Sequence, residues 1–432
     1  MYSQLKLEII DFFSCKDILW WLFVIWLICI PLSTAASSVL MFSCFIVIIH
    51  RLIKIKLYSN VESLIFSKKF LYISCLPLLV FIYLSVTFSF TSASPSSAWS
   101  YLSKYFELAI FPIFTYGFIT IKKKYRLKLI VAFLLSVFIL SFVLLVYQIY
   151  LIYSDVSGVY SYAFDGYIDK HRIKFGTVSA LAAGISFFYF KEKSAPLKIS
   201  RFSFVWFVFS VVFLNHGRTG IFVFICLSLC LVASFGVNLK RLKSIIPTSL
   251  LIILLLYFVP NPIASEIHDA FGEINFYSEV INEKNIERLL HSSLLLRFEF
   301  SKTGWSSFLL SPLFGNGVGS IPLMFNTVSP YSDYIDCGNF HIAFLNTLSQ
   351  FGVFGFLLFS VFYISLIRYS KSLDNFYRRI LLCVIIWISI HSFVNSFYID
   401  SYCGYLHLIL LSLFVSLIPS DDEITLHFSE SH

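Results

Sequence analysis

Charged residues are scarce in this chain of 432 residues. Asp, Glu, Lys and Arg together make up 13% of the sequence, whereas 58% of the residues are hydrophobic and Phe alone occupies 50 positions. A soluble domain has no interior large enough to bury that much apolar surface. The composition therefore excludes an ordinary soluble protein, and it predicts that residues 1–432 form a single integral membrane domain.

The residue patterns of metal and disulfide sites are also missing. The nine cysteines show neither a disulfide framework nor a metal-ligand spacing. A divalent-metal transferase needs clustered carboxylates, and no Asp-x-Asp or Glu-rich pair stands at a predicted helix end. Asp333 and Asp336 lie near His341 without forming an Asp-x-Asp pair, and we interpret them as solvated loop residues; the alternative is that Asp336 orients the imidazole. We expect neither a metal ion nor another cofactor.

The basic residues are arranged as orientation signals of a membrane protein. The formal net charge is +8, which could suggest a nucleic-acid partner. The Lys and Arg residues, however, cluster beside hydrophobic segments, where they set the direction in which each segment is inserted. We therefore expect contacts with membrane lipids and no nucleic acid.

Apolar runs near the length of a membrane-spanning helix, about 20 residues, recur along the chain. They predict an all-α polytopic membrane protein with about twelve transmembrane helices. The predicted spans are Ile18 to Ser33, Ser37 to Arg51, Phe70 to Phe90, Tyr105 to Ile121, Leu129 to Ile152, Phe175 to Phe190, Phe202 to Leu214, Thr219 to Val237, Ser244 to Pro260, His341 to Ile367, Ile380 to Phe397 and Tyr402 to Pro419.

Alternate breaks between these spans carry most of the 32 Lys and Arg residues. The basic breaks are residues 1–17, 51–69, 122–128, 191–201, 240–243 and 368–379. By the positive-inside rule these breaks face the cytoplasm, so both termini are predicted to be cytoplasmic. The other breaks, including the long segment 261–340 between the ninth and tenth spans, face the outer side. The N-terminal stretch lacks a small-residue cleavage site, so we expect its helix to be retained.

Nine cations remain on the outer side, where topology does not explain them. They are Lys104, Lys170, Arg172, Lys174, Arg218, Lys284, Arg288, Arg297 and Lys302. Lys284, Arg288 and Lys302 lie in a Glu-rich loop and are interpreted as contacts to lipid headgroups or water. Arg218 lies in a short turn between two spans, beside free helical N–H groups, which suits phosphate binding. A headgroup anchor is the alternative for Arg218.

The outer segment 261–340 is too long to be a simple connector, and long loops that keep some structure often carry function. Its stretch Ser292 to Leu310, ended by Pro312, is predicted to be helical. Residues at spacings of three and four would form one face of this amphipathic helix, which could lie on the membrane with its arginine at the interface. These residues are Leu294, Arg297, Ser301, Trp305 and Phe308.

Three glycines and a histidine follow this helix. Gly315, Gly317 and Gly319 occupy five positions, a spacing that permits a tight turn or the close approach of backbone N–H groups to an anion. His341 then opens the tenth predicted span. There the positive end of the helix dipole disfavours the imidazolium and leaves a ring that can accept a proton. A structural histidine at the membrane interface is the alternative.

Four patches, taken in order, resemble the O-antigen ligase family and the related O-antigen and exopolysaccharide polymerases. They are Arg172-Ile173-Lys174-Phe175-Gly176-Thr177, the turn Gly217-Arg218-Thr219-Gly220, Arg297 with Trp305 and Ser311 to Gly319, and His341 with Gly352 and Gly355. Two positions depart from the family's usual pattern. Ile342 stands where Asn or Ser normally follows the histidine, and Gly217 stands where Ser or Thr is commoner before the arginine.

The resemblance implies a GT-C-like domain in the bacterial inner membrane and a metal-independent, inverting glycosyl transfer at its periplasmic face. The donor would be an undecaprenyl-diphosphate-linked glycan, and the acceptor a sugar hydroxyl on lipid A-core or on another lipid-linked glycan. Arg218 and Arg297, with Arg172 as a weaker third, would bind the diphosphate. His341 would take the proton from the acceptor hydroxyl. Supporting residues would be Asp336, Gly315, Gly317, Gly319 and Lys104.

Three functions stay open from the sequence. A ligase, which we favour, would move the glycan onto lipid A-core, whereas a polymerase would move it onto another lipid-linked repeat unit. These two share their chemistry and differ only in the acceptor. A flippase or transporter for lipid-linked glycans would carry ionisable residues along a path through the membrane, and this sequence has almost none there.

Overall fold

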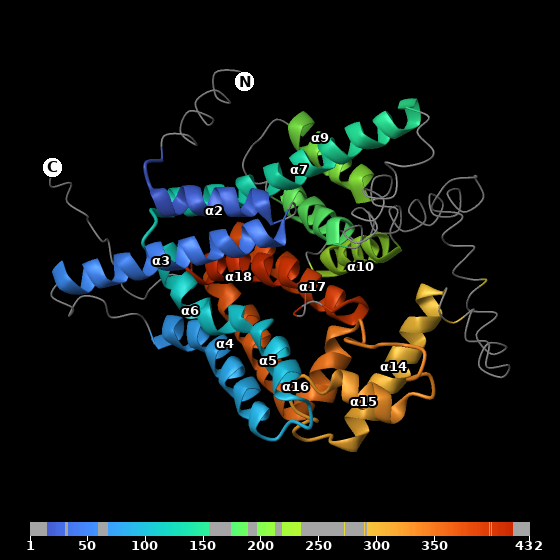
Figure 1. The fold of residues 1–432 in the computed structure, drawn as a ribbon. Coiled ribbons are helices and arrows are strands. Elements are labelled where there is room, and N and C mark those ends of the chain that lie inside the picture. Colours follow the sequence, from blue (N-terminus) through green and yellow to red (C-terminus); the bar gives the residue numbers. More distant parts are fainter. Residues whose placement is uncertain are drawn as a thin grey trace.

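The computed structural model describes residues 15–30, 33–58, 68–154, 174–188, 197–211, 218–234, 292–396 and 400–417, together with residues 272, 289 and 398. All regular elements in these ranges are helices (Figure 1). The N-terminal half contains α2 (Ile18–Cys29), α3 (Thr34–Tyr58), α4 (Lys68–Val86), the short 3-10 helix η2 (Thr87–Ser89), α5 (Pro95–Ser103), α6 (Phe106–Ile119), α7 (Lys123–Ser154), a helix over Lys174–Phe188 and α9 (Leu197–Phe209). The C-terminal half contains α10 (Arg218–Ser234), α14 (Ser293–Leu310), α15 (Ile321–Val328), α16 (Ala343–Tyr369), η4 (Ser370–Ser372), α17 (Asn375–Val394) and α18 (Ser401–Val415).

Five of these helices are long and apolar enough to cross a membrane, which confirms a helical, multi-pass membrane protein. They cover Thr34–Lys54, Phe70–Ser89, Lys123–Tyr150, Ala343–Ser372 and Asn375–Val394. The predicted spans coincide with helices wherever the structure describes them. The predicted span Ser244 to Pro260 lies outside the described residues, so the number twelve stays a prediction.

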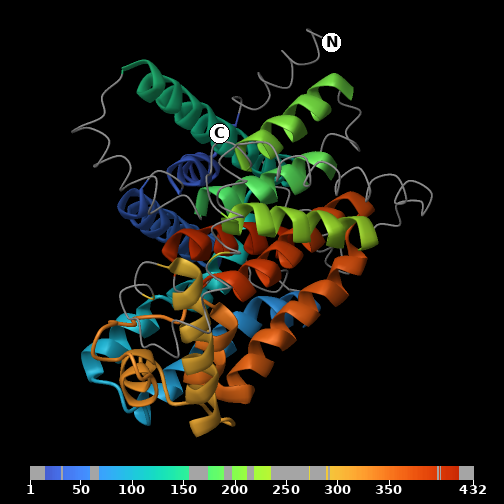
Figure 2. The same ribbon diagram turned by 90° about the vertical axis from the view of Figure 1, so that its right-hand side faces the viewer.

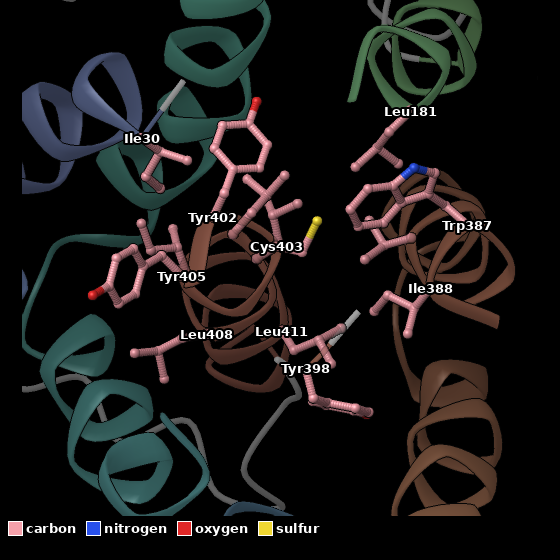
Figure 3. Packing of buried hydrophobic residues seen from close by; sticks show 14 of the residues in the cluster. Ile30, Leu181, Trp387, Ile388, Tyr398, Tyr402, Cys403, Tyr405, Leu408 and Leu411 are labelled. Atoms are coloured by element: carbon pink, nitrogen blue, oxygen red, sulfur yellow. The ribbon is translucent and has the colours of Figure 1, made fainter. Parts of the chain in front are cut away.

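α18 forms the centre of the helical bundle. Its residues from Tyr402 to Val415 are all buried, and it packs against α3, α4, α6 and α17. Figure 3 shows its side chains meeting Ile30 on one side and Leu181, Trp387 and Ile388 on the other. Burial on every face explains why this segment is apolar throughout instead of showing a helical stripe.

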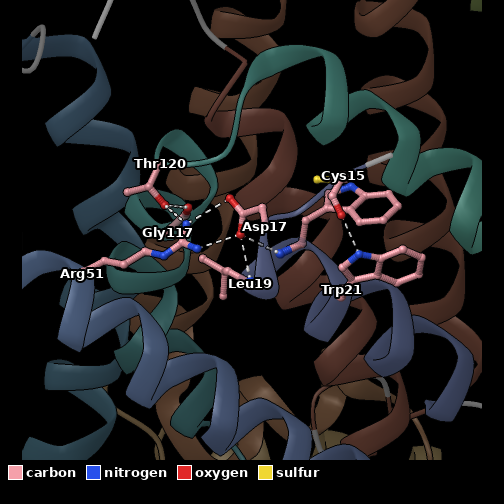
Figure 4. A network of polar contacts seen from close by, with 8 residues as sticks. Cys15, Asp17, Leu19, Trp21, Arg51, Gly117 and Thr120 are labelled. Atoms are coloured by element: carbon pink, nitrogen blue, oxygen red, sulfur yellow. Dashed lines mark hydrogen bonds and ion pairs between the residues drawn. The ribbon is translucent and has the colours of Figure 1, made fainter. Parts of the chain in front are cut away.

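Several predicted cytoplasmic breaks meet at one end of the bundle, which we call the inner end. Arg51 of α3 donates from Nη2 to Asp17 Oδ1 at 2.7 Å and from Nη1 to Asp17 Oδ2 at 3.1 Å. Nη1 also donates to Thr120 Oγ1, just after α6, at 3.2 Å (Figure 4). Asp17 in turn caps α2 by accepting from Leu19 N at 2.8 Å. This cluster brings the breaks before α2, late in α3 and after α6 to the same end.

The opposite end, which we call the outer end, joins the segment after α4 to the glycine-rich stretch after α14. Thr91 Oγ1 donates to Val318 O at 2.8 Å, and Ser97 Oγ donates to Gly319 O at 3.1 Å. α14 and α15 pack beside the start of α16, as both ribbon views show (Figure 1, Figure 2). The short helices α5 and α15 were not among the predicted elements.

Candidate functional site

α14 positions the first residue of the site. Ser292 Oγ accepts from Leu295 N at 3.0 Å and caps the helix, so α14 covers nearly the residues that its sequence predicts. Arg297, one turn later, is half-buried. Its Nη1 lies 3.5 Å from Thr219 Oγ1 of α10 and 3.4 Å from the carbonyl oxygen of Val394 at the end of α17. The guanidinium therefore lies between three helices.

The membrane-facing surface predicted for α14 is divided in the structure. Trp305 is exposed, but Phe308 is buried and Arg297 reaches α10 and α17. The helix packs on α15 and α16 because its own polar side chains find partners there. Ser307 Oγ lies 2.6 Å from Ser349 Oγ of α16, and the buried Glu299 accepts from Ser329 Oγ, just after α15, at 3.1 Å. The five residues predicted to share one face therefore meet different surroundings, and contact of α14 with the membrane stays a prediction.

His341 stands two residues before α16, whereas the sequence predicted that it would be the first residue of the span. Its φ is 55°, a left-handed conformation that no other non-glycine residue adopts in the described part of the chain. Such a backbone is unfavourable for a side chain larger than glycine and persists only where the surroundings impose it. Its ring is stacked on Phe300 of α14, with 5.5 Å between the ring centroids.

Arg297 and His341, 44 positions apart in the sequence, come close together at the outer end. His341 is an exposed residue, while the surrounding protein and then the positive charge of Arg297 lower the pKa of His341 from its ordinary value. The ring is therefore neutral near pH 7. A neutral, accessible imidazole beside a guanidinium can accept a proton while a bound anion is held by the arginine.

The glycine-rich stretch is bonded to the protein itself. Asn316 N donates to Ser349 O and Gly317 N to Gln350 O, each at 2.9 Å. Gly319 N donates to Gln350 Oε1 at 2.7 Å. Gly315, Gly317 and Gly319 all have positive φ, and a Cβ on Gly315 would lie 2.3 Å from Gln350 C. These contacts support the tight-turn interpretation, because the N–H groups that could hold an anion already have acceptors in the chain.

The partner of this turn is a break inside α16. Gly352 has φ 64° and ψ −169°, so the helix is interrupted there. Val353 N donates to Pro312 O at 2.9 Å and Phe354 N donates to Leu313 O at 3.1 Å. The glycine turn therefore accepts the hydrogen bonds that the broken helix cannot make within itself. In this way the turn fixes the first half of α16 and, with it, the segment that carries His341.

Two of the predicted arginines fall at or beyond the limits of the described residues. Arg218 is the first residue of α10, but its side chain is not described. Arg172 lies outside the described residues. Its neighbour Lys174 is described, and its Nζ lies 2.9 Å from Asp400 Oδ1 at the start of α18. The side chain of Thr219, directly after Arg218, contacts Arg297, so α10 begins beside the site.

Lys104 and Asp336 both lie near Tyr101. The Lys104 Nζ is 4.5 Å from the centroid of the Tyr101 ring, and burial lowers the pKa of Lys104. Burial, followed by the charges of Cys337 and Asp336, raises the pKa of Tyr101 to about 12. No described hydrogen bond joins Asp336 to His341. The alternative in which Asp336 orients the imidazole therefore gains no support from these contacts.

Cys337 and possible metal ligands complete the description of the site. Cys337 is buried, which is the main reason that its pKa is raised to about 12, and its thiol donates to Asn339 O at 3.3 Å. Such a thiol is a poor nucleophile because it stays protonated. Within the described ranges, no three His, Cys, Asp or Glu side chains lie close enough together to hold a metal ion.

The residues that surround His341 were not predicted from the sequence. Asn339 Oδ1 accepts from His341 N at 2.6 Å, from Asn346 Nδ2 at 3.1 Å, and from Ser396 Oγ. The pair Asn339 and His341 matches the spacing of an Asx turn, which was a usable local signal. Ser396 gave no sequence signal because it lies more than 50 positions from His341 in the chain. Val394 gave none because it lies more than 50 positions from Arg297 and contributes only a backbone oxygen.

Comparison with known families agrees with this arrangement. Residues 203–360 match the family model described as O-Antigen ligase. This range contains Arg218, Arg297 and His341, and it ends within α16. No curated protein matches the chain. The resemblance seen in the sequence motifs is thus confirmed over this range, and the part of the chain that holds the candidate site is similar to the O-antigen ligase family.

Proposed function

We propose that this protein transfers a glycan from undecaprenyl diphosphate to a sugar hydroxyl of lipid A-core at the periplasmic face of the bacterial inner membrane. The observation that carries the proposal is that α14 brings Arg297 to His341: Phe300, one turn after Arg297, is stacked on the imidazole with 5.5 Å between the ring centroids, and the charge of Arg297 lowers the pKa of the histidine. A cation suits the diphosphate of the donor, and a neutral imidazole suits the hydroxyl of the acceptor. The family match supports the same class of reaction.

The proposed reaction is a single displacement. The acceptor hydroxyl oxygen attacks the anomeric carbon and forms the new glycosidic bond, while its proton passes to His341. The bond between the anomeric carbon and the diphosphate oxygen breaks, and its electron pair leaves with the diphosphate. Attack opposite the leaving group inverts the anomeric centre. Because the leaving diphosphate is already stable, arginines are sufficient in this scheme and no metal ion is required.

Arg297 would hold the diphosphate by its forked donors, and Arg218 would add a second guanidinium from the start of α10. Thr219 links these two positions, since it follows Arg218 directly and its Oγ1 lies 3.5 Å from Arg297 Nη1. The N-terminal N–H groups of α10 would favour an anion at the same place. Arg172 remains a weaker third candidate, two residues before the Lys174 that pairs with Asp400.

Lipopolysaccharide from a deletion strain tests the proposal and separates it from its closest alternative. Loss of a ligase leaves bare lipid A-core on a gel, whereas loss of a polymerase leaves core capped with one repeat unit. Loss of a flippase would leave the lipid-linked glycan on the cytoplasmic side of the membrane. Transfer by the purified protein, from isolated lipid-diphosphate glycan to isolated lipid A-core, is expected for a ligase. No transfer to either acceptor would overturn both enzymatic functions.

A further inference from the structure

The loop before α16 contains an asparagine that accepts three hydrogen bonds on one oxygen. Asn339 Oδ1 receives the backbone N–H of His341 at 2.6 Å, Asn346 Nδ2 of α16 at 3.1 Å, and the hydroxyl of Ser396. A backbone N–H can only donate, so the atom facing His341 must be the carbonyl oxygen of the amide. Asn346 agrees with this assignment, because its own Oδ1 accepts from Phe340 N at 3.0 Å.

These bonds act on the one described non-glycine residue that has a positive φ. His341 has a φ of 55°, and its N–H is the group that Asn339 holds. A histidine in an unrestrained loop would relax to negative φ and turn its ring away from Phe300. The oxygen of Asn339 therefore keeps the imidazole in its present direction, stacked on Phe300.

Ser396 connects this loop to the turn between α17 and α18. The same turn region supplies Val394 O, which lies 3.4 Å from Arg297 Nη1, and Asn395 O, which accepts from Ala343 N at 3.0 Å. Residues 394–396 thus contact Arg297, the loop residue Asn339 and Ala343 at the start of α16. It lies beyond residues 203–360, the range that matches the family.

We propose that Asn339 and Ser396 are positioning residues. They hold His341 in its proton-accepting orientation, next to the place where Arg297 would bind the diphosphate of the donor. Neither residue touches the reacting atoms. The inference rests on the proposed function of His341 as the base, and it adds a part of the chain outside the family match to the working site. A misplaced base loses rate although its chemistry is unchanged.

The experiment measures transfer from isolated lipid-diphosphate glycan to isolated lipid A-core by purified variants in proteoliposomes. Asn339→Ala is expected to lower kcat about 10- to 100-fold with the KM of each substrate nearly unchanged. Asn339→Asp keeps the acceptor oxygen and should recover most of the rate at higher pH. Its carboxylate favours the imidazolium and raises the pKa of His341, so the acidic limb of the kcat profile should move to higher pH. Asn326→Ala, on the exposed side of α15, is the matched control with wild-type kinetics.

Ser396 provides a second, independent variant if Asn339→Ala does not accumulate in the membrane. Ser396→Ala should lower kcat about 3- to 10-fold, because Asn339 keeps its other two donors, and Ser396→Thr should recover the rate. Wild-type kcat in Asn339→Ala or in Ser396→Ala, while His341→Ala is inactive, would overturn the positioning role and leave the proposed function intact. Full activity of His341→Ala would instead overturn the proposed function. A rise in KM without a change in kcat would show that these residues bind substrate, which also contradicts the inference.

Discussion

Arg51 at the inner end and Arg297 at the outer end are both half-buried arginines between helices, but their surroundings differ. Arg51 uses both terminal nitrogens on the carboxylate of Asp17, at 2.7 and 3.1 Å, and one of them also donates to Thr120. Arg297 lies 3.4 and 3.5 Å from two neutral oxygens and acts on His341 by its charge.

The difference indicates two uses of one side chain. The guanidinium of Arg51 binds the Asp17 carboxylate through both terminal nitrogens at short distance, and this contact fixes the ends of α2, α3 and α6 relative to one another. Arg297 instead reaches the oxygens of two other helices and lies next to a histidine whose pKa its charge lowers, which is typical of a functional site. Substitutions at the two ends should therefore separate effects on stability from effects on rate.

The largest expected effect is on the rate, at His341. His341→Ala should lower transfer by about 10² to 10⁴, the contribution typical of a general base, while donor binding and membrane abundance stay near wild type. Photo-crosslinking to the lipid-diphosphate glycan, run beside a transfer assay, measures the two properties separately. Asp333→Ala, an exposed residue of the same loop, is the control. Transfer at the wild-type rate would make the histidine an interface residue only.

The next effect concerns the stability of the outer end. Gly315→Ala places a Cβ 2.3 Å from the backbone of Gln350 at a position where φ is 75°. Strain and the displaced backbone together should cost about 2 to 5 kcal/mol of unfolding free energy. Thermal unfolding in detergent checks this. Gly338→Ala is the matched control, because its nearest neighbour, Tyr101 Oη, is 3.6 Å away; equal stability of the two variants would contradict the tight-turn role.

Arg297→Lys tests the outer arginine directly. Lysine keeps the positive charge but lacks the planar fork that binds a diphosphate by two parallel hydrogen bonds. Transfer should fall by about 10- to 100-fold, and donor crosslinking should weaken, without loss of folded protein. Lys302→Ala, on the exposed side of the same helix, should behave like the wild type. Loss of folded protein in Arg297→Lys would remove the distinction from Arg51.

Arg51→Ala should show the opposite pattern. Removing the guanidinium leaves the partly buried carboxylate of Asp17 with its helix-capping bonds alone, and we expect a loss of about 1 to 3 kcal/mol in stability. The transfer rate per folded molecule should be unchanged. Lys54→Ala, exposed near the end of α3, serves as the control. A rate defect in folded Arg51→Ala would mean that the inner end is coupled to the reaction.

The smallest effect is a change in pH dependence. Below its pKa, His341 carries a proton and cannot act as a base, so the rate falls as the pH drops through that pKa. Burial and Arg297 lower this pKa, so the acidic limb of kcat in the wild type should lie below the ordinary range of histidine. Arg297→Gln removes one of the two causes of the lowered pKa of His341, namely the positive charge. Its acidic limb should lie at higher pH than that of the wild type, and an unchanged limb would show that the charge of Arg297 does not reach the imidazole in solution.

The sequence was sufficient for features that depend on local patterns. The apolar runs predicted the helices, and Ser292 with the break at Pro312 predicted the limits of α14, since capping and helix termination are set by nearby residues. The approach of Arg297 to His341 was expected only through the family resemblance. The sequence left two roles open for the glycine turn, because the acceptors of Asn316 N, Gly317 N and Gly319 N lie on α16, more than 30 positions further along the chain.

Contacts between distant segments could not be predicted in the same way. Asn339 has a local signal, but its third donor, Ser396, lies in a turn whose composition says nothing about what it faces. α5 was missed because it is short and its tertiary bond, Ser97 to Gly319 O, is not visible in any periodicity. The predicted face of α14 is divided between protein contacts and exposed side chains for a related reason, since spacing alone does not tell which side of a helix meets protein.

The interruption of α16 at Gly352 also bears on how the protein enters the membrane. The half of the helix before the break buries Asn346, Thr347, Ser349 and Gln350, whereas the half after it is largely apolar. Polar side chains of this kind partition poorly into lipid when they have no protein partners. The partners of Ser349 and Gln350, which are Ser307 of α14 and Gly319 of the glycine turn, precede α16 in the chain and are already present when α16 is synthesised. The order of segments in the chain thus suits lateral insertion into the membrane of the apolar half of α16, after Gly352. The polar half, before Gly352, is then buried against protein that is already in place.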